Sequence, residues 1–463
     1  MYTSHQPAQH PNRVALHNEI HARPPGAMQA PLAISHIVMV CDATQREASR
    51  AHVADLLRNH HLPLPDAATT HIRMDMGSYR IRWELHTEFV TWTFMRPLSE
   101  DEANPAAGTP TPQTAIGAVP QMWLQALPGL CLASLNLWLL TAGSSLSTHL
   151  VRQSMDPELL IGSTVAGGFA EVYTDFAMGA QGYSSMVLLV GGMSEDGEST
   201  QSMAGAQAGR TVEGAKMTPR RLGRLVQRLL EIETYRMTAL MGLPAAREAS
   251  GVLAFAEREL AELAGAIRSA SRSDEPELLD RLTRLAGQVE SQHAATHSRF
   301  SASAAYFELV DRRIADINET RLGGMQTIRD FMDRRLTPAR STCEWAARRQ
   351  NALSERVSRI SNLLRTRVEI EQQQSSQALL TTMNDRQGVQ LQLQSTVEGL
   401  SVAAITYYIV GLITYLAKGA DKLGWPWSPE STAAAAIPAV ALAVWWSLRR
   451  LHRKLFNRAA VPA

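Results

Sequence analysis

GLSVAAITYYIVGLITYLA, residues 399–417, is an uncharged run of about 19 residues, close to the roughly 20 that a helix needs to cross a membrane. A second uncharged run, STAAAAIPAVALAVWWSL at 431–448, is of similar length and ends in two tryptophans, which favour the lipid headgroup region. Only the turn-rich segment 418–430 separates the two runs. The alternative, a buried hairpin in a globular domain, fits two runs of this length less well. The sequence therefore predicts a two-helix transmembrane hairpin at 399–448.

The charges around the two runs predict which side of the membrane each part occupies. Lys and Arg collect on the cytoplasmic side of membrane proteins. The tail 449–463 is strongly basic, whereas the positive and negative charges of the loop 418–430 cancel. Two crossings return the chain to the side on which it started. We therefore expect a multi-pass protein of the inner (cytoplasmic) membrane, in contact with the lipid bilayer, with two spans and with both termini in the cytoplasm.

The composition of the chain argues against several classes of protein. Its 463 residues include 45 Lys and Arg against 44 Asp and Glu, so no excess of positive charge favours nucleic acid. The cysteines Cys41, Cys131 and Cys343 are too far apart for a zinc knuckle and suit a reducing compartment. Residues 1–23 are polar and lack the apolar core of a secretory signal. We expect no nucleic-acid partner, no cofactor and no metal.

The first half of the chain predicts an α+β (mixed α/β) cytoplasmic domain at 31–192, preceded by an N-terminal arm at 1–30. Five or six strands and a first helix are expected from stretches at 34–40, 44–60, 79–86, 89–95, 130–140, 163–176 and 183–190. The Pro-rich stretch 99–121 predicts an exposed loop within this domain. Residues 193–217 are rich in Gly, Ser and Ala, which predicts a flexible linker.

Helical spacing dominates from residue 218 to residue 398. Thr218 is expected to cap the first helix, with Pro219 at its first helical position. Breaks near 242–244, 271–276, 323–324 and 338 divide the segment into long helices. The last helix has the apolar spacing of a coiled coil, at Leu353, Val357, Ile360, Leu364 and Val368. We expect a helical stalk that continues into the first span and that supports a homo-oligomer.

Three polar residues suggest a site on the sheet. Glu84, His86 and Glu88 alternate with other residues, so that a strand would place all three on one face. Carboxylates beside an imidazole are suited to acid/base chemistry or metal binding. The alternative is a solvated or ion-paired sheet face without chemistry. The enzyme hypothesis predicts a concave pocket around these residues.

A second candidate site lies on the first span. Glu398, Ser401, Tyr408 and Tyr415 are separated by three or seven residues, which places them on one helical face. In an oligomer packed around that face, Glu398 would form a ring of carboxylates at the cytoplasmic mouth of a pore. The alternative is that the tyrosines lie at the membrane interface and that this face packs on the second span.

Three further motifs have a functional and a structural interpretation. The string HNEIH at 17–21 could offer two histidines to a metal, although it more closely fits an arm held on the domain by Glu19, His21 and Arg23. The glycines of IGSTVAGG at 161–168 lack the pattern of a phosphate loop and favour a bend or hairpin. The segment 312–367 has thirteen Arg against six acidic residues, which could contact anionic lipid or form salt bridges within the helical bundle.

Four stretches resemble a family of bacterial membrane-anchored proteins classed as a domain of unknown function. They are LHNEIHARPP at 16–25, ELHTEFVTWTF at 84–94, RLVQRLLEIETYRM at 224–237 and TVEGLSVAAITYYIVGLITYLAKG at 396–419. The resemblance covers nearly the whole chain. It implies membership of the family and no particular chemistry.

The order of domains resembles that of CorA-type magnesium transporters and of mitochondrial Rmd1-type proteins. CorA-type proteins carry Gly-Met-Asn after the first span, where this chain has Leu416, Ala417, Lys418 and Gly419. Magnesium selectivity of that kind is therefore not expected. The sequence favours a non-enzymatic membrane-anchored scaffold or regulatory protein of CorA-like architecture, with cation conduction as a secondary possibility. The alternative is a membrane-tethered enzyme with its site around His86.

Overall fold

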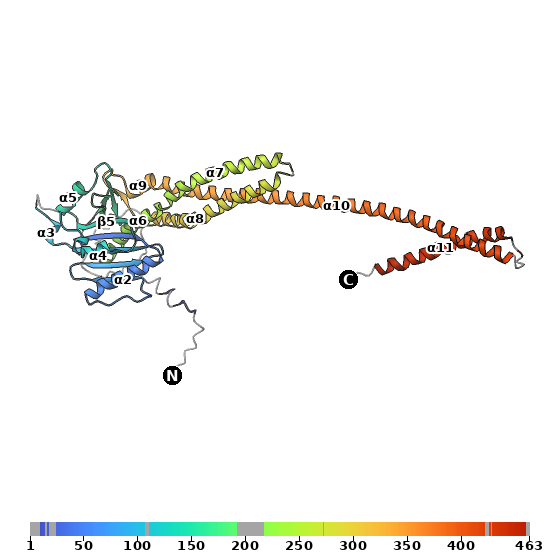
Figure 1. Cartoon of the computed structure of the whole chain (residues 1–463). Helices are drawn as coiled ribbons and strands as arrows, with labels where there is room; N and C mark the ends of the chain where they lie inside the picture. Colours follow the sequence, from blue (N-terminus) through green and yellow to red (C-terminus); the bar gives the residue numbers. More distant parts are fainter. Residues whose placement is uncertain are drawn as a thin grey trace, which may run out of the picture. The chain divides into compact units, whose positions relative to one another are not determined.

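The computed structural model describes residues 10–13, 16–17, 25–106, 111–191, 217–271, 273–421, 426 and 428–459, with side chains up to residue 450. The chain forms two compact units, residues 1–360 and residues 361–463, which are described separately. Figure 1 shows the sheet and most helices in the first unit and the two apolar helical segments in the second.

The first unit is built on one mixed sheet of nine described strands in the order β2-β3-β4-β1-β5-β8-β7-β6-β9. All neighbouring strands are antiparallel except β5 and β8, which are parallel. The predicted mixture of strands and helices is therefore confirmed. The strands are β1 (Leu32–Val40), β2 (His71–Asp75), β3 (Arg80–Leu85), β4 (Phe89–Pro97), β5 (Leu130–Thr141), β6 (Ile161–Val165), β7 (Ala170–Thr174), β8 (Ser184–Val190) and β9 (Thr320–Arg321).

One face of the sheet carries the main aromatic core, which includes Trp83, Trp92 and Phe94. It is covered by α2 (Ala43–Asn59), α4 (Gln121–Gln125) and α5 (Ser145–Ser154). The stretch 99–121, predicted as an exposed loop, contains the short helices α3 (Glu100–Ala103) and η1 (Ala115–Ala118). It buries Ala103, Ala115 and Val119, because small side chains fit against the sheet there.

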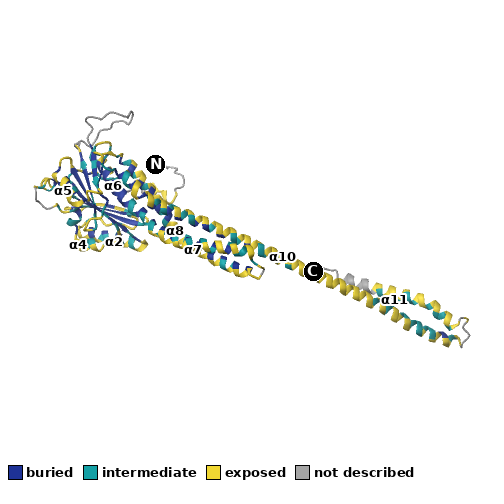
Figure 2. Ribbon diagram, turned by 90° about the horizontal axis from the view of Figure 1, so that it is seen from above, coloured by how far each residue is buried: buried dark blue, intermediate teal, exposed yellow. Residues whose placement is uncertain are grey.

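The opposite face of the sheet is covered by α6 (Pro219–Leu240), which begins with the predicted cap at Thr218. The apolar stripe of α6 is buried, at Leu222, Leu225, Val226, Leu229 and Leu230. The helices that follow are α7 (Gly242–Ser269), α8 (Glu275–Asp316), α9 (Ile328–Arg335) and the beginning of α10 (Thr337–Asp421). Their boundaries confirm the predicted breaks. Figure 2 shows the strands as the most deeply buried part of this unit.

The second unit contains the rest of α10 and α11 (Pro429–Ala459), which runs back alongside the end of α10 (Figure 1). Both helices are long and apolar enough to cross a membrane. A core helix of a soluble protein would be buried, whereas 11% of the apolar window of α10 and 0% of that of α11 are buried. Pro438 lies inside α11. These two helices weakly indicate that the protein associates with a membrane.

Candidate functional site

A polar cavity of about 270 Å³ lies between the sheet and α6. Strands β1, β3 and β4 form its floor, and residues of α6 and α8 close it from the other side. The described residues that line it are His36, Arg82, Glu84, His86, Phe89, Thr91, Thr93, Gln227, Leu230, Glu231, Thr234, Tyr235 and Arg313. Such a concentration of charged groups beneath a helix distinguishes this cavity from the apolar core on the other face.

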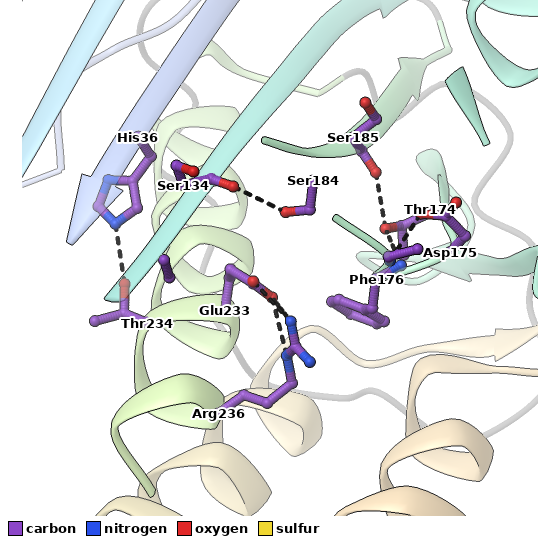
Figure 3. Close-up of polar contacts among 12 residues, drawn as sticks. His36, Ser134, Thr174, Asp175, Phe176, Ser184, Ser185, Glu233, Thr234 and Arg236 are labelled. Atoms are coloured by element: carbon purple, nitrogen blue, oxygen red, sulfur yellow. Dashed lines mark hydrogen bonds and ion pairs between the residues drawn. The ribbon is translucent and has the colours of Figure 1, made fainter. Parts of the chain in front are cut away.

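His36 connects the floor of the cavity to α6. The imidazole is 5% exposed; its Nε2 lies 2.9 Å from Thr234 Oγ1 (Figure 3), and its Nδ1 lies 2.8 Å from Thr93 Oγ1. The Thr234 hydroxyl donates to the carbonyl of Leu230, so it accepts from His36 Nε2–H, while Nδ1 accepts from Thr93. Burial lowers the pKa of His36 to about 3, which keeps the ring neutral.

The β3 side of the cavity is formed by a buried ion pair. Arg82 Nη2 donates to Glu84 Oε1 at 2.6 Å, and the two side chains are 8% and 11% exposed. Alternation along β3 points both residues away from the aromatic core. The same pair also lines a neighbouring cavity of about 340 Å³ with His71 and Arg73 of β2. A buried ion pair adds little net stability, because desolvation offsets the attraction, so its presence suggests a role other than stability.

The helical side of the cavity carries a second ion pair. Arg313 of α8 donates to Glu231 of α6, and its Nη1 also donates to Asp316 at 3.1 Å. Glu231 accepts a further hydrogen bond from Gln227 at 2.8 Å. The cavity therefore lies between two pairs of opposite charges, one from the sheet and one from the helices.

The neighbouring turn of α6 presents another buried pair to a different part of the sheet. Glu233 is 3% exposed and accepts from Arg236 Nη2 at 2.7 Å (Figure 3). The Arg236 guanidinium lies 5.0 Å from the centre of the Phe176 ring. Neither Glu233 nor Arg236 lines the cavity. The ion pair lies within α6, and the contact of Arg236 with Phe176 joins this helix to the segment after β7.

The structure brings together two of the three residues predicted on the sheet face. Glu84 and His86 both line the cavity, and the His86 ring stacks on Phe89 at 4.5 Å. Glu88 lies outside it, where it accepts from Arg299 at 3.0 Å and from Tyr306 at 3.1 Å. The separation arises because β3 ends at residue 85 and the turn that follows redirects Glu88 towards α8.

Several lining residues were not identified from the sequence. His36 stands within the apolar run of β1, and a lone polar residue in such a run is a signal that it has a buried partner. Arg82 lies two residues before Glu84 on β3 and therefore on the same face of the strand. Arg313 belongs to the Arg-rich segment, where nothing local distinguishes it from its neighbours. Glu231 and Thr234 lie within the stretch 224–237, which carries the family resemblance but no recognisable site motif.

Of the residues predicted on the first span, Tyr408 and Tyr415 are exposed on α10, whereas Glu398 and Ser401 are partly buried. Tyr408 and Tyr415 are 71% and 76% exposed, so α11 does not cover them. The Ser401 hydroxyl donates to the carbonyl of Val397 at 2.8 Å, within the same helix. At these two tyrosines the face does not pack on the second span. Lys418 lies 5.8 Å from the centre of the Tyr415 ring.

The remaining motifs have simpler explanations or lie outside the described residues. Glu19, His21 and Arg23 are not described. IGSTVAGG forms the hairpin of β6 and β7, with a turn in which Ala166, Gly167 and Gly168 have φ of 56°, 73° and 98°. Many arginines of the segment 312–367 make ion pairs, to partners such as Glu257, Asp311 and Glu344. Within the described ranges no group of three His, Cys, Asp or Glu is placed to hold a metal.

Comparison with known proteins gives a family and no relative of known activity. No curated protein and no solved structure matches the chain significantly. The profile of a family described as proteins of unknown function, DUF3422, matches residues 8–213 and 205–455. Two stretches that carry the family resemblance, 84–94 and 224–237, provide most of the residues that line the cavity beneath α6. The chain belongs to the DUF3422 family.

Proposed function

We propose that this chain is a membrane-anchored, non-enzymatic regulatory protein whose body binds a small zwitterionic ligand in the cavity between the sheet and α6. The observation that carries the proposal is the pair of opposed walls, Arg82 with Glu84 and Arg313 with Glu231, around about 270 Å³. A ligand with one amine and one carboxylate can pair with both walls, because each wall offers both signs of charge.

The hydrogen bonds around the cavity favour binding over catalysis. His36 uses both ring nitrogens in contacts with Thr93 and Thr234, and its pKa of about 3 makes it a poor base near neutral pH. The described lining contains no Cys, Ser or Lys that would act as a nucleophile. Groups already oriented by their neighbours are suited to recognise a ligand without reacting with it.

The binding proposal is tested on the full-length protein in lipid nanodiscs. The probes are glycine, glutamate, arginine and betaine. Acetate, which carries only a negative charge, and butylamine, which carries only a positive charge, are the controls. We expect at least one zwitterion to raise the unfolding temperature of the wild type, because a ligand that binds only the folded state stabilises it. Glu231→Gln should abolish that shift, whereas Glu355→Gln, on an exposed pair with Arg359, should not. No shift with any zwitterion would contradict the proposal.

The anchoring proposal rests on the exposed apolar helices of the second unit. The basic tail after the second span supports a cytoplasmic location for both termini. Cell fractionation of the intact chain should find it in the inner membrane, and a version that ends at residue 397 should be soluble. A fluorescent reporter fused after residue 463 should be located on the cytoplasmic side of the membrane. A freely soluble intact chain would refute the anchor.

A membrane-tethered enzyme remains the second candidate, because His86 lies in a concave site beside Glu84. The enzyme hypothesis predicts a pocket around Glu84, His86 and Glu88, and the first two of these residues line this one. The two functions are separated by following each probe by mass spectrometry during incubation with the protein. A chemical change in a bound probe that is lost in His86→Gln would favour the enzyme.

We also propose a homo-oligomer of CorA-like architecture, with ion conduction as a secondary role. The exposed face of α10 with Tyr408 and Tyr415 supports this, because it leaves apolar and aromatic side chains for another helix or for lipid. Mass measurement in nanodiscs should give more than one copy. Proteoliposome flux should fall in Glu398→Ala if the face lines a path. Absence of flux for common cations would remove conduction while leaving the anchor in place.

The Arg-rich segment 312–367 is a further candidate contact with anionic lipid. The ion pairs described above use many of its arginines, which favours a structural role for those residues. Among the described residues, no carboxylate forms an ion pair with Arg312 or Arg365, and both lie at exposed positions. Binding of the full-length nanodisc protein to vesicles with and without anionic lipid, at low and high salt, tests this contact.

A further inference from the structure

A long stretch of α10, residues 376–397, is not covered by any described part of the chain. Every residue of this stretch is exposed, whereas Leu353 and Val357, earlier on the same helix, are buried. At about 1.5 Å per residue, the stretch is roughly 33 Å long. It leads directly into the apolar segment that we propose as the first membrane span. The described part of the chain therefore leaves a long piece of helix without a packing partner.

This stretch also lacks the charges that stabilise a solitary helix in water. Between Glu371 and Glu398 the only charged residues are Asp385 and Arg386, which are adjacent in the sequence. Ion pairs on a helix surface form between residues three or four positions apart, so these two do not form one. A helix in water depends on such pairs or on the packing of an apolar face. Packing against another helix is therefore the source of stability that remains.

An apolar stripe with the spacing of a coiled coil runs along the stretch. Its positions are 379, 383, 386, 390, 393 and 397, which are alternately four and three residues apart. The apolar members are between 56% and 64% exposed, namely Leu379, Met383, Leu393 and Val397. The polar members are Arg386 and Gln390. In heptad terms, 383, 390 and 397 are a positions, and 379, 386 and 393 are d positions.

The stripe continues on the same side of the helix into the first span. At about 100° per residue, Tyr408 and Tyr415 lie within about 20° of Val397 around the helix axis. Both tyrosines are exposed, so α11 does not cover this side of α10. One largely exposed face thus extends from Leu379 to Tyr415, over about 54 Å.

We propose that this face packs on α10 of a second copy of the chain, as a parallel, in-register coiled coil through residues 379–397. The proposal rests on the membrane anchor and the homo-oligomer proposed above, and it assigns the interface. A partner for the whole face must itself pass from the cytoplasm into the bilayer beside α10. The α10 helix of another copy does so, with the same residues at the same depth. Identical residues then face each other, which a stripe with a single charged member permits.

The two polar members of the stripe give this interface a testable character. Gln390 meets its own counterpart, and two facing amides can each donate and accept a hydrogen bond. A polar residue at an a position fixes the register of a coiled coil at a cost in stability. Arg386 brings two positive charges together at a d position, which weakens the association. We therefore expect the copies to associate reversibly, and Arg386→Leu to strengthen their association.

Disulfide cross-linking of the full-length protein in lipid vesicles tests which residues meet. The background carries Cys131→Ser, because Cys131 is the exposed native cysteine. Leu393→Cys should form a disulfide between copies, since d positions of in-register helices face each other. Leu391→Cys is the matched control: its side chain is 58% exposed but points about 160° away from that of Leu393. It should cross-link at least about tenfold less.

Energy transfer between copies that carry donor and acceptor dyes measures the association in vesicles at increasing ratios of lipid to protein. Leu393→Asp should weaken the association at least about tenfold, because it places like charges in the interface. Leu391→Asp makes the same change on the opposite side of the helix and should alter it by less than about twofold. Arg386→Leu should strengthen it at least about threefold.

The outcomes separate the interface from the homo-oligomer itself. If the copies associate but Leu393→Cys cross-links no better than Leu391→Cys, this interface is wrong although the homo-oligomer stands. Equal weakening by Leu393→Asp and Leu391→Asp would lead to the same conclusion. Absence of energy transfer in the wild type at every ratio would overturn both proposals. If Leu393→Cys is protected from a water-soluble maleimide without cross-linking, lipid or another segment of the chain covers the face, and the proposed coiled coil is absent.

Discussion

The N-terminal arm contacts α6 so closely at Gly223 that adding a methyl group there should displace it. A Cβ built on Gly223 would lie 1.7 Å from the carbonyl oxygen of Gly26 and 2.9 Å from its carbon. These separations are far shorter than van der Waals contact, and both nearest atoms belong to the backbone. In Gly223→Ala the arm must therefore move away from the helix by more than 1 Å, on the order of one bond length.

The destabilisation by Gly223→Ala can be estimated from the contacts that the arm would lose. Met28 is 5% exposed, and its N–H donates to the carbonyl of Pro219 at 3.0 Å. Overpacking costs about 1–3 kcal/mol, and exposing a buried Met costs about 1.5–3 kcal/mol. The higher helix propensity of Ala returns up to about 1 kcal/mol. We expect a net loss of about 1.5–6 kcal/mol in the free energy of unfolding.

Hydrogen exchange and thermal unfolding of the full-length protein in nanodiscs measure this loss. The amide of Met28 should exchange faster in Gly223→Ala, and the unfolding temperature should fall by at least about 4 °C. The control is Gly265→Ala on α7, where an added Cβ meets nothing within 4 Å. That change should be neutral or stabilise by up to about 1 kcal/mol. Unchanged protection of Met28 together with an unchanged unfolding temperature would refute the close contact.

Three further predictions concern the cavity beneath α6 and the membrane anchor. Glu84→Gln leaves Arg82 buried without its partner and should lower stability in thermal unfolding by about 3 kcal/mol, whereas Glu47→Gln, on a carboxylate that is 70% exposed, should change it by less than about 0.5 kcal/mol. His36 has a pKa of about 3 in the folded protein against 6.5 when unfolded, so the unfolded chain binds the extra proton and stability falls as the pH drops below 6.5. Relative to His36→Gln, the wild type should lose about 2 kcal/mol between pH 6.5 and pH 5 in urea titrations, and a pH-independent difference would contradict a neutral buried ring. Leu412→Asp, within the first span, should reduce the membrane-bound fraction of the chain in fractionation, because a charge in the bilayer core costs about 3 kcal/mol.

Most of the regular structure could be predicted from local patterns. Strands near residues 34–40, 89–95 and 183–190 are apolar and β-branched, and the structure has β1, β4 and β8 there. The prediction of five or six strands was too low for three reasons. The edge strand β2 has few apolar residues, β9 has only two residues, and the single predicted stretch 163–176 contains both β6 and β7. An edge strand is half exposed and so lacks the apolar run that identifies a central one.

The candidate site could be predicted only in part. Alternation along β3 correctly placed Glu84 near His86, since strand periodicity is a local property. The opposite wall, with Glu231 and Arg313, comes from helices that follow about 150 to 230 residues later in the chain. No local pattern specifies which helix covers which face of a sheet. Hydrogen-bond partners such as Thr234 for His36 likewise depend on that packing.

The pairing of β9 with β6 has a practical consequence for dissecting the protein. Thr320 and Arg321 complete the sheet edge beyond β6, and α6 shields the face that carries His36 and Val38. A fragment that stops before residue 193 would therefore keep an unpaired strand edge and a bare apolar surface, both of which promote aggregation. Deletion mapping of interactions should keep residues 25–360 together, so that loss of binding is not mistaken for loss of folding.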